Sequence, residues 1–470
     1  MHVDKMFVCR PTSRLPLVRS GGKARRRHVQ RGAQPDRPGR VYDDEQQRLF
    51  SNVSPPSFVH APGSVLSASV LVAGTAVGAG ILALPQALAG AGLVPAAASI
   101  TGAAVFSILT GLAVAEVSIN TLCELGGGSG VSLGSMATRT LGSAGSAAVQ
   151  VTYLLLHYTL LVAYTAKAGS TISDMVGLDE AGQVAAFGAP AAFTLVIGGL
   201  CAIATPKQLD KANVTLVAGV IASFVFLLAS VAPSVDLSNA TTVVETAHWD
   251  VLTRSLPVVA LSFVFQNVVP VITSQLEGDR RKIRSAIVGG ISVPWAMFML
   301  WTGTILLASS GLADMDGLAA VDGTLGADID PLAALRSTSA TNALLIDAFS
   351  LLAVSTSYIG FVLGLKEFLL EALDMTEERG RVIVYPLVLF PPLAAALAFP
   401  SLFYAALEFA GTYGVLSLFG IIPVLMTWSE RYSEDEVTLT KLRLVPGGKV
   451  VLTMLGVTSV GIIADQALGL

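Results

Sequence analysis

Apolar residues dominate the chain from about residue 64 to its end, and short polar stretches divide them into segments. About 20 apolar residues cross the hydrocarbon core of a bilayer as an α-helix, and the pattern predicts about eleven such helices. Their approximate ranges are 66–90, 93–116, 145–168, 185–204, 213–233, 256–275, 286–309, 345–371, 382–399, 402–428 and 450–468. The predicted fold class is therefore an all-α polytopic membrane protein.

Two of these segments contain residues that disfavour a continuous helix near mid-membrane. In the first segment, the stretch from Gly74 to Pro85 is rich in glycine. In the sixth segment, the stretch from Ser262 to Pro270 contains an amide pair and a proline. Backbone polar groups that are freed inside a bilayer need a ligand, an ion or a protein partner. The pattern therefore predicts discontinuous helices one and six that form a binding site.

The two interruptions lie five helices apart. Because five is odd, a second copy of a five-helix unit enters the membrane upside down relative to the first. Interrupted helices at matching places in two halves are typical of transporters built from inverted repeats, with the site near the bilayer midplane. We predict a transporter domain over 64–470, with one repeat at about 64–235, a second at about 255–430 and an extra helix at about 450–468.

Composition and charge agree with this class. The chain is 53% hydrophobic and 13% charged, with a mean hydropathy of +0.68, whereas about a quarter of an ordinary soluble domain is charged. The net charge is −4, and the positive residues are confined to the N-terminus and short loops, so no nucleic-acid partner is expected. Lys and Arg follow the even-numbered helices, which places those loops and the N-terminus on the inner side.

Residues 1–60 form a separate basic extension that is expected to be disordered. Residues 1–40 are rich in arginine and contain only two acidic residues, Asp4 and Asp36. An arginine-rich, acid-poor extension fits an organelle transit peptide, and a disordered cytosolic tail is the alternative. The first interpretation predicts a plastid membrane and the second a plasma membrane.

Three parts of the chain resemble the tryptophan/tyrosine permease family. They are the run from Gly74 to Pro85, the stretches 353–361 and 364–368, and the stretch 418–423 with Trp428. The resemblance implies ten core helices with helices one and six discontinuous, and symport of an aromatic amino acid with a cation. The same fold carrying small aliphatic amino acids, or a membrane ion channel, is the alternative. An enzyme is not expected, because the chain has neither a nucleotide-binding loop nor a hydrolase motif.

The chemistry of an amino acid substrate suggests which residues bind it. Free N–H groups of an unwound helix suit its carboxylate, and free C=O groups suit its ammonium. The candidate substrate-binding residues are Gly74, Thr75, Gly78, Ala79 and Gly80 in helix one and Phe265, Gln266 and Asn267 in helix six. The alternatives are close helix packing for the glycines and a satisfied interhelical hydrogen bond for the amides.

Candidate coupling and gating residues lie in other helices. Ser355, Thr356 and Ser357 form a hydroxyl cluster in helix eight, and such hydroxyls either bind Na⁺ or a proton-coupled group, or bond their own helix. Glu116 and His157 are ionisable groups at membrane depth, although Glu116 also suits an interfacial position and His157 a packed aromatic cluster. No cofactor and no definite metal site are expected, and H⁺ and Na⁺ both remain open as coupling ion.

Overall fold

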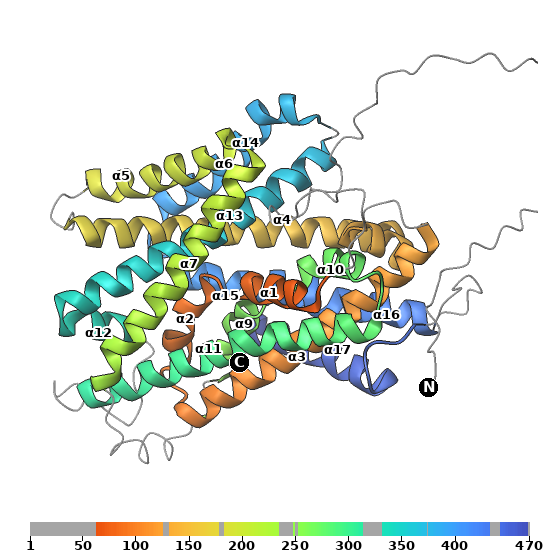
Figure 1. Ribbon diagram of the computed structural model, residues 1–470, viewed down its shortest axis with the longest axis horizontal. Helices are drawn as coiled ribbons and strands as arrows, with labels where there is room; N and C mark the ends of the chain where they lie inside the picture. The colour runs from red at the N-terminus through yellow and green to blue at the C-terminus, as the bar shows by residue number, and fades with distance from the viewer. Residues whose placement is uncertain are drawn as a thin grey trace, which may run out of the picture.

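The computed structural model describes residues 63–125, 131–177, 183–234, 248–249, 252–313, 331–373, 375–432 and 442–468. All regular structure in these ranges is helical (Figure 1). The predicted N-terminal extension, residues 1–60, lies outside the described residues.

Each half of the chain folds into long helices interspersed with short ones. The first half comprises α1 (Val65–Ala76), α2 (Gly80–Leu88), α3 (Leu93–Leu125), α4 (Leu133–Val176), α5 (Gln183–Phe193), the π-helix η3 (Thr194–Gly198), α6 (Gly199–Ile203), α7 (Pro206–Val231) and η4 (Ala232–Ser234). The second half comprises α9 (Leu252–Ser262), η5 (Gln266–Val268), α10 (Val269–Gln275), α11 (Arg280–Ala313), α12 (Pro331–Thr338), α13 (Ala340–Ala372), α14 (Glu377–Ala398), α15 (Phe403–Phe409), the π-helix η7 (Ala410–Ile421), α16 (Ile422–Tyr432) and α17 (Gly448–Leu468).

Length and hydropathy confirm the all-α membrane class. In the described part of the chain, eight helical segments are long and apolar enough to cross a bilayer, and there are nine when the bent pair α1 and α2 counts as one span. Two shorter apolar helices, Phe187–Ile203 and Val382–Ala398, coincide with the fourth and ninth predicted segments. The count of eleven and the inverted repeat stay predictions.

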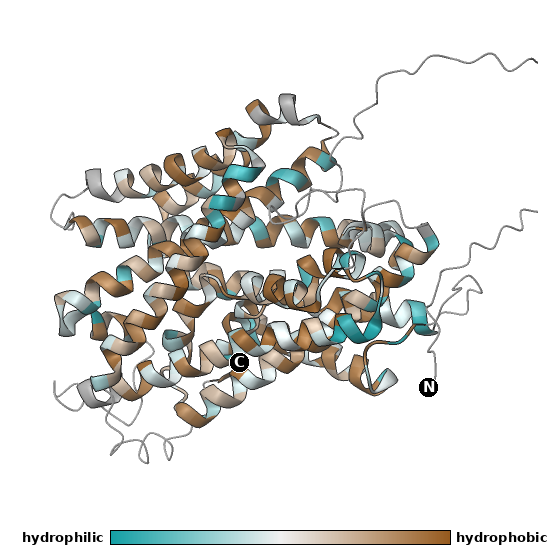
Figure 2. Ribbon diagram, viewed as in Figure 1, coloured by the Kyte–Doolittle hydropathy of each residue, from teal (hydrophilic) through white to brown (hydrophobic). Residues whose placement is uncertain are grey.

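The interrupted helices lie inside the bundle rather than at its edge. Figure 1 shows the short helices α1, α2, α9 and α10 in the middle of the molecule, between the longer helices α4 and α11. Within the span formed by α9, η5 and α10, 72% of the most apolar window is buried, against 17% for α17. Figure 2 shows that apolar residues cover most of the long helices and that hydrophilic residues gather at α16. The break of helix six is therefore enclosed by other helices.

Two observed helices extend beyond their predicted ranges, one past a charged residue that finds a partner inside the protein and one back to a capping residue. The second segment was expected to end at Glu116, but α3 continues to Leu125, and Glu116 forms a buried ion pair. The third was expected at 145–168, but α4 begins at Leu133 behind a capping box formed by Ser132 and is kinked at Gly142, whose φ is 71°. Compensated charges and caps let a helix extend beyond its apolar stretch.

Candidate substrate site at two broken helices

Helix one breaks where the sequence predicts it. α1 ends at Ala76 and α2 begins at Gly80, with a bend of 56° between them. Val77 has an extended backbone, and its N–H donates the last helical bond to the Ala73 carbonyl at 2.8 Å. The carbonyls of residues 74–77 consequently lack the amides that a continuous helix would bring to them.

Some main-chain N–H groups at this break have a hydrogen-bond acceptor and others do not. The Ala79 N–H donates to Ser357 Oγ at 2.9 Å. Within the described part of the chain, no hydrogen-bond acceptor faces the N–H groups of Gly78 and Gly80. Two unpartnered donors next to unpartnered carbonyls at a helix N-terminus form a potential binding surface for a group that carries both charges.

Helix six is interrupted at the matching place. α9 ends at Ser262, and a short 3₁₀ turn at Gln266–Val268 leads into α10, which carries Pro270 in its first turn. Within the gap, the Phe263 carbonyl accepts a hydrogen bond from Ser107 Oγ of α3 at 2.6 Å. A side chain of a neighbouring helix thus satisfies one of the carbonyls that the break sets free.

The two breaks are in direct contact. A Cβ on Gly80 would lie 2.7 Å from Ser262 Oγ and 2.9 Å from Ser262 Cα, which is closer than two non-bonded atoms can pack. Glycine is needed here because only its lack of a side chain allows the start of α2 to approach the end of α9 so closely. Gly74, by contrast, faces open space, so close packing does not explain the glycine at that position.

Helix eight contributes one hydroxyl to the site. Ser357 of α13 accepts from the Ala79 amide and lies where a Cβ on Gly78 would come within 2.5 Å of its Oγ. The other hydroxyls of the predicted cluster serve their own helix. Ser355 donates to the Leu351 carbonyl at 2.6 Å, and Thr356 donates to the Ala353 carbonyl at 2.9 Å. Thr75 of helix one likewise bonds the Leu71 carbonyl.

Gln266 holds the break of helix six against α3. Its Nε2 donates to Ser107 Oγ at 3.1 Å and to Thr110 Oγ1 at 3.0 Å, and its Oε1 accepts from the Phe265 amide at 3.0 Å. The side chain is buried, and its amide makes three hydrogen bonds, all to groups of the protein. This geometry corresponds to the alternative interpretation, a satisfied interhelical hydrogen bond. Sequence reasoning missed Ser107 and Thr110, although two hydroxyls three residues apart in an apolar helix mark one polar face.

Phe265 and Asn267, the neighbours of Gln266, have different surroundings. The Phe265 ring is fully buried and packs where Gly111 of α3 leaves room for it. Asn267 is half-buried, and its Oδ1 has no hydrogen-bond partner within the described residues. Of the three residues predicted to contact the substrate, Asn267 is the one with an unused acceptor at the break.

His157 belongs to a packed aromatic cluster between α4 and α13. Its Nδ1 lies 2.9 Å from the Tyr153 carbonyl, and its ring stacks on the Tyr153 ring at 3.8 Å between centroids. The Phe361 ring meets it edge-on at 5.0 Å. These contacts correspond to the packed-aromatic alternative, and none of them joins His157 to either break.

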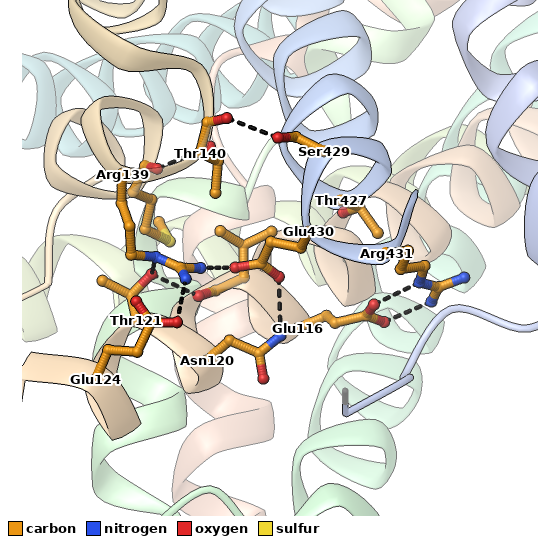
Figure 3. A network of polar contacts seen from close by, with 12 residues as sticks. Glu116, Asn120, Thr121, Glu124, Arg139, Thr140, Thr427, Ser429, Glu430 and Arg431 are labelled. Atoms are coloured by element: carbon orange, nitrogen blue, oxygen red, sulfur yellow. Dashed lines mark hydrogen bonds and ion pairs between the residues drawn. The ribbon is translucent and has the colours of Figure 1, made fainter. Parts of the chain in front are cut away.

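Glu116 belongs to the polar network drawn in Figure 3. Its carboxylate accepts two hydrogen bonds of 2.6 Å from the Arg431 guanidinium and two more from the amides of Leu444 and Val445, at 2.6 and 3.2 Å. Sequence reasoning did not pair Glu116 with Arg431, because 315 residues separate them. The pair is a buried tie between α3 and α16 rather than part of the site at the breaks.

The polar groups at the two breaks are neutral. Among the described residues, no group of three His, Cys, Asp or Glu side chains is placed to hold a metal ion. The surface at the breaks consists of main-chain N–H and C=O groups, the Ser357 hydroxyl and the Asn267 amide. Such a set of donors and acceptors suits a small zwitterion better than an ion of one sign.

Comparison with known proteins assigns the family. The sequence profile of the tryptophan/tyrosine permease family matches residues 62–465. The chain belongs to this family. The family comprises membrane permeases, so the prediction of a transport protein rather than an enzyme is confirmed.

Relatives of this permease carry names from the same family. It is 26% identical to the "Tyrosine-specific transport system 1" of Haemophilus influenzae, with 78% of this chain and 88% of that protein aligned. It is also 26% identical to the "Tryptophan-specific transport protein" of Pseudomonas aeruginosa, with 78% and 87% aligned.

A solved structure has the same fold. The permease superposes on MhsT in complex with L-phenylalanine with a TM-score of 0.58, over 86% of this chain and 98% of that one. The two sequences are 13% identical, so the likeness concerns the fold alone.

Proposed function

We propose that this permease is a secondary active transporter that moves a neutral aromatic amino acid together with a cation by alternating access. The observation that carries the proposal is the direct contact between two broken helices at Gly80 and Ser262, with unpartnered main-chain groups beside it. Its family and the names of its relatives support an aromatic substrate.

The proposed binding mode assigns the two ends of the zwitterion to different main-chain groups. The unpartnered amides of Gly78 and Gly80 receive the carboxylate. The carbonyls released from Gly74 onward, together with Asn267 Oδ1, receive the ammonium. Phe265 borders this space as a fixed apolar wall, and Gln266 keeps it in place.

The proposed cation site is the hydroxyl of Ser357 together with released carbonyls of helix one. Both Na⁺ and a proton-coupled arrangement fit an oxygen-lined space without a carboxylate, so the proposal leaves H⁺ or Na⁺ to experiment. Ser355 and Thr356 lie next to this site, but their hydroxyls bond carbonyls of their own helix. They would have to give up these hydrogen bonds to bind an ion.

The proposed architecture follows from the matching breaks. Residues 64–235 and 255–430 form the two repeats, residues 450–468 the extra helix, and helices one, two, six and seven rock against the rest. For the location we propose a plasma membrane, since the relatives named above are bacterial. The plastid alternative gains no support from them.

Uptake into proteoliposomes tests the function. Labelled tyrosine and tryptophan are offered under an imposed pH gradient or sodium gradient, with an excess of aliphatic amino acids or glutamine as competitors. Accumulation above the external concentration under one gradient is expected, because only coupled transport concentrates its substrate. Equilibration without accumulation would favour a channel, and competition by aliphatic amino acids alone would favour the narrower alternative.

The Gly78→Leu variant tests the proposed carboxylate site. A Cβ at Gly78 already lies 2.5 Å from Ser357 Oγ, so the larger side chain must displace Ser357 or fill the site. We expect no accumulation by this variant. Normal uptake would remove the main-chain amides of this region from the mechanism.

A further inference from the structure

A second feature, distant from the breaks, joins the ends of α3, α4 and α16. Arg139 of α4 donates through Nε to Thr121 Oγ1 at 2.9 Å and through one terminal nitrogen to Glu124 Oε1 at 2.8 Å, both on α3. Its other terminal nitrogen forms an ion pair with Glu430 of α16. The second oxygen of Glu430 accepts from Asn120 of α3 at 2.8 Å. Figure 3 shows Arg139 at the centre of these contacts.

A second set of contacts lies beside this network, and we call it the Glu116 unit. It consists of Glu116, Arg431, Arg284 and the segment 442–447. Glu116 accepts hydrogen bonds from the Leu444 and Val445 amides of the segment 442–447. Arg431 donates to the Val445 carbonyl at 3.0 Å. Arg284 of α11 donates to the Leu444 carbonyl at 2.9 Å. The unit therefore ties α3, α11 and α16 to the chain that leads into α17.

Burial distinguishes the Arg139–Glu124 pair from the other ion pairs of this network, since Glu430, the second ion-pair partner of Arg139, is 3% exposed. The side chains of Glu116 and Arg431 are 0% and 4% exposed, whereas those of Arg139 and Glu124 are 18% and 25% exposed. Separating a fully buried pair leaves charges without water or partner, which is strongly destabilising. A pair at the edge of the bundle exchanges its partner for water at much lower cost. Arg139 and Glu124 are thus the two charges of this network that already reach water at the edge of the bundle.

The contacts of α3 show which way it would move. Ser118 of α3 and Thr273 of α10 share a buried hydrogen bond of 2.7 Å, and Gln266 bonds α3 at the break of helix six. The first two contacts join α3 to helix six, and the Glu116 unit joins it to α11 of helix seven and to α16, the end of helix ten. α4 meets α3 at this end through Arg139, and it meets α16 through the Arg139–Glu430 ion pair and through Ser429 Oγ, which donates to the Thr140 carbonyl at 2.7 Å.

We propose that Arg139 is the latch that holds the inner end of this permease closed, and that the Glu116 unit stays intact when the latch opens. When the end opens, α16, the end of helix ten, joins the moving helices and moves with α3 away from α4. Arg139 then leaves Thr121, Glu124 and Glu430, and water hydrates the separated charges. The segment 442–447 travels with α3 because Glu116 holds it. The inference rests on the alternating-access mechanism proposed above and adds the contact that controls one of its two openings.

The inner side is assigned by charge. Lys207, Arg280, Arg281 and Lys282 begin helices at the side where the sequence predicts the inner loops. By the same topology, α3 and α16 end on that side and α4 begins there.

A distance measurement in lipid nanodiscs tests the latch without any substrate. Spin labels are attached to cysteines at Thr138 of α4 and Ser285 of α11, both exposed at this end, in a background in which the natural cysteines are replaced. We expect Arg139→Gln to raise the ratio of long to short label distances about tenfold, since it removes charged hydrogen bonds worth about 1.5 kcal/mol or more. Lys211→Gln, which removes an exposed charge from α7, serves as the matched control.

Two further variants keep the test decisive if Arg139→Gln folds poorly. Glu124→Gln removes one partially exposed contact and should give a smaller shift in the same direction. The double variant Arg139→Gln with Glu430→Gln leaves no unpaired buried carboxylate and should resemble Arg139→Gln alone, because the two residues act as one unit. Unchanged distances in Glu124→Gln and in the double variant would overturn the proposal, as would an equal shift in Lys211→Gln.

The outcome is separable from that of the uptake experiment. If no amino acid is accumulated but Arg139→Gln lengthens the distance, the proposed substrate fails and the latch stands. If uptake proceeds and every variant keeps the wild-type distances, the latch fails and the transport function stands.

Discussion

The contact between the two broken helices can be tested by adding one carbon atom. In Gly80→Ala, the new Cβ would lie 2.9 Å from Ser262 Cα, whereas ordinary van der Waals contacts are 3.4–4 Å. Relief therefore requires a backbone shift of about half an ångström between α2 and α9. Rotation of the Ser262 hydroxyl away from Gly80 does not remove this overlap, because the Cα belongs to the main chain.

The free-energy cost of Gly80→Ala depends on the fact that the new Cβ overlaps with a main-chain atom. Extra carbon atoms in a packed interior cost about 1–3 kcal/mol when the backbone must move. If the bound geometry bears that cost, the dissociation constant rises about 5- to 150-fold. Part of the cost also falls on the fold, so the thermal midpoint of the purified protein should decrease.

Equilibrium binding of labelled tyrosine and tryptophan to the purified protein measures the effect. Gly360→Ala is the matched control, since Gly360 lies on α13, one turn from Ser357, and a Cβ there meets open space. Alanine also favours a helix over glycine, so the control should be as stable as the wild type or more so. Wild-type affinity in Gly80→Ala, or an equal loss in both variants, would refute the close contact of the two breaks.

Three other predictions follow from individual contacts. Ser357→Ala should weaken substrate binding about 2- to 10-fold, because the amide at the break of helix one loses its acceptor, whereas Ser355→Ala should bind normally; equal effects in the same binding assay would contradict the assignment. Gln266→Leu removes three hydrogen bonds and should lower the free energy of unfolding by about 2–4 kcal/mol, which a lower thermal midpoint would reveal. A midpoint equal to that of the wild type would show that the amide does not support the break. Glu116→Gln leaves Arg431 buried without a carboxylate and should destabilise the fold by about 3–5 kcal/mol, which would be apparent as aggregation on gel filtration or a large drop in midpoint; a variant as stable as the wild type would argue against the buried tie.

Local sequence determined much of the fold. The long apolar segments determine the helices, since a bilayer accepts only backbones whose polar groups are satisfied. Both breaks lie within the stretches that were predicted to be interrupted, the glycine-rich run of the first span and the amide pair with proline of the sixth. Pro400 and Ser401 separate α14, which ends at Ala398, from α15, which begins at Phe403, as predicted.

The roles of individual polar residues were less predictable, because neighbouring residues of one kind point in different directions. Ser355, Thr356 and Ser357 are equivalent as a sequence pattern, yet Ser357 is the one that bonds the break of helix one. In the amide pair, Gln266 is satisfied by α3 and Asn267 keeps an unused acceptor. The rotation of each helix about its axis decides these roles, and that rotation depends on packing.

The sequence alone thus established the membrane class, the approximate spans and the two interruptions, all of which depend on the composition of short windows of residues. Only the tertiary structure brought Gly80 against Ser262 and paired Glu116 with Arg431, whose partners lie in helices distant along the chain. Such pairings depend on which helices become neighbours, and local hydropathy carries no information about that choice because every buried helix face is similarly apolar.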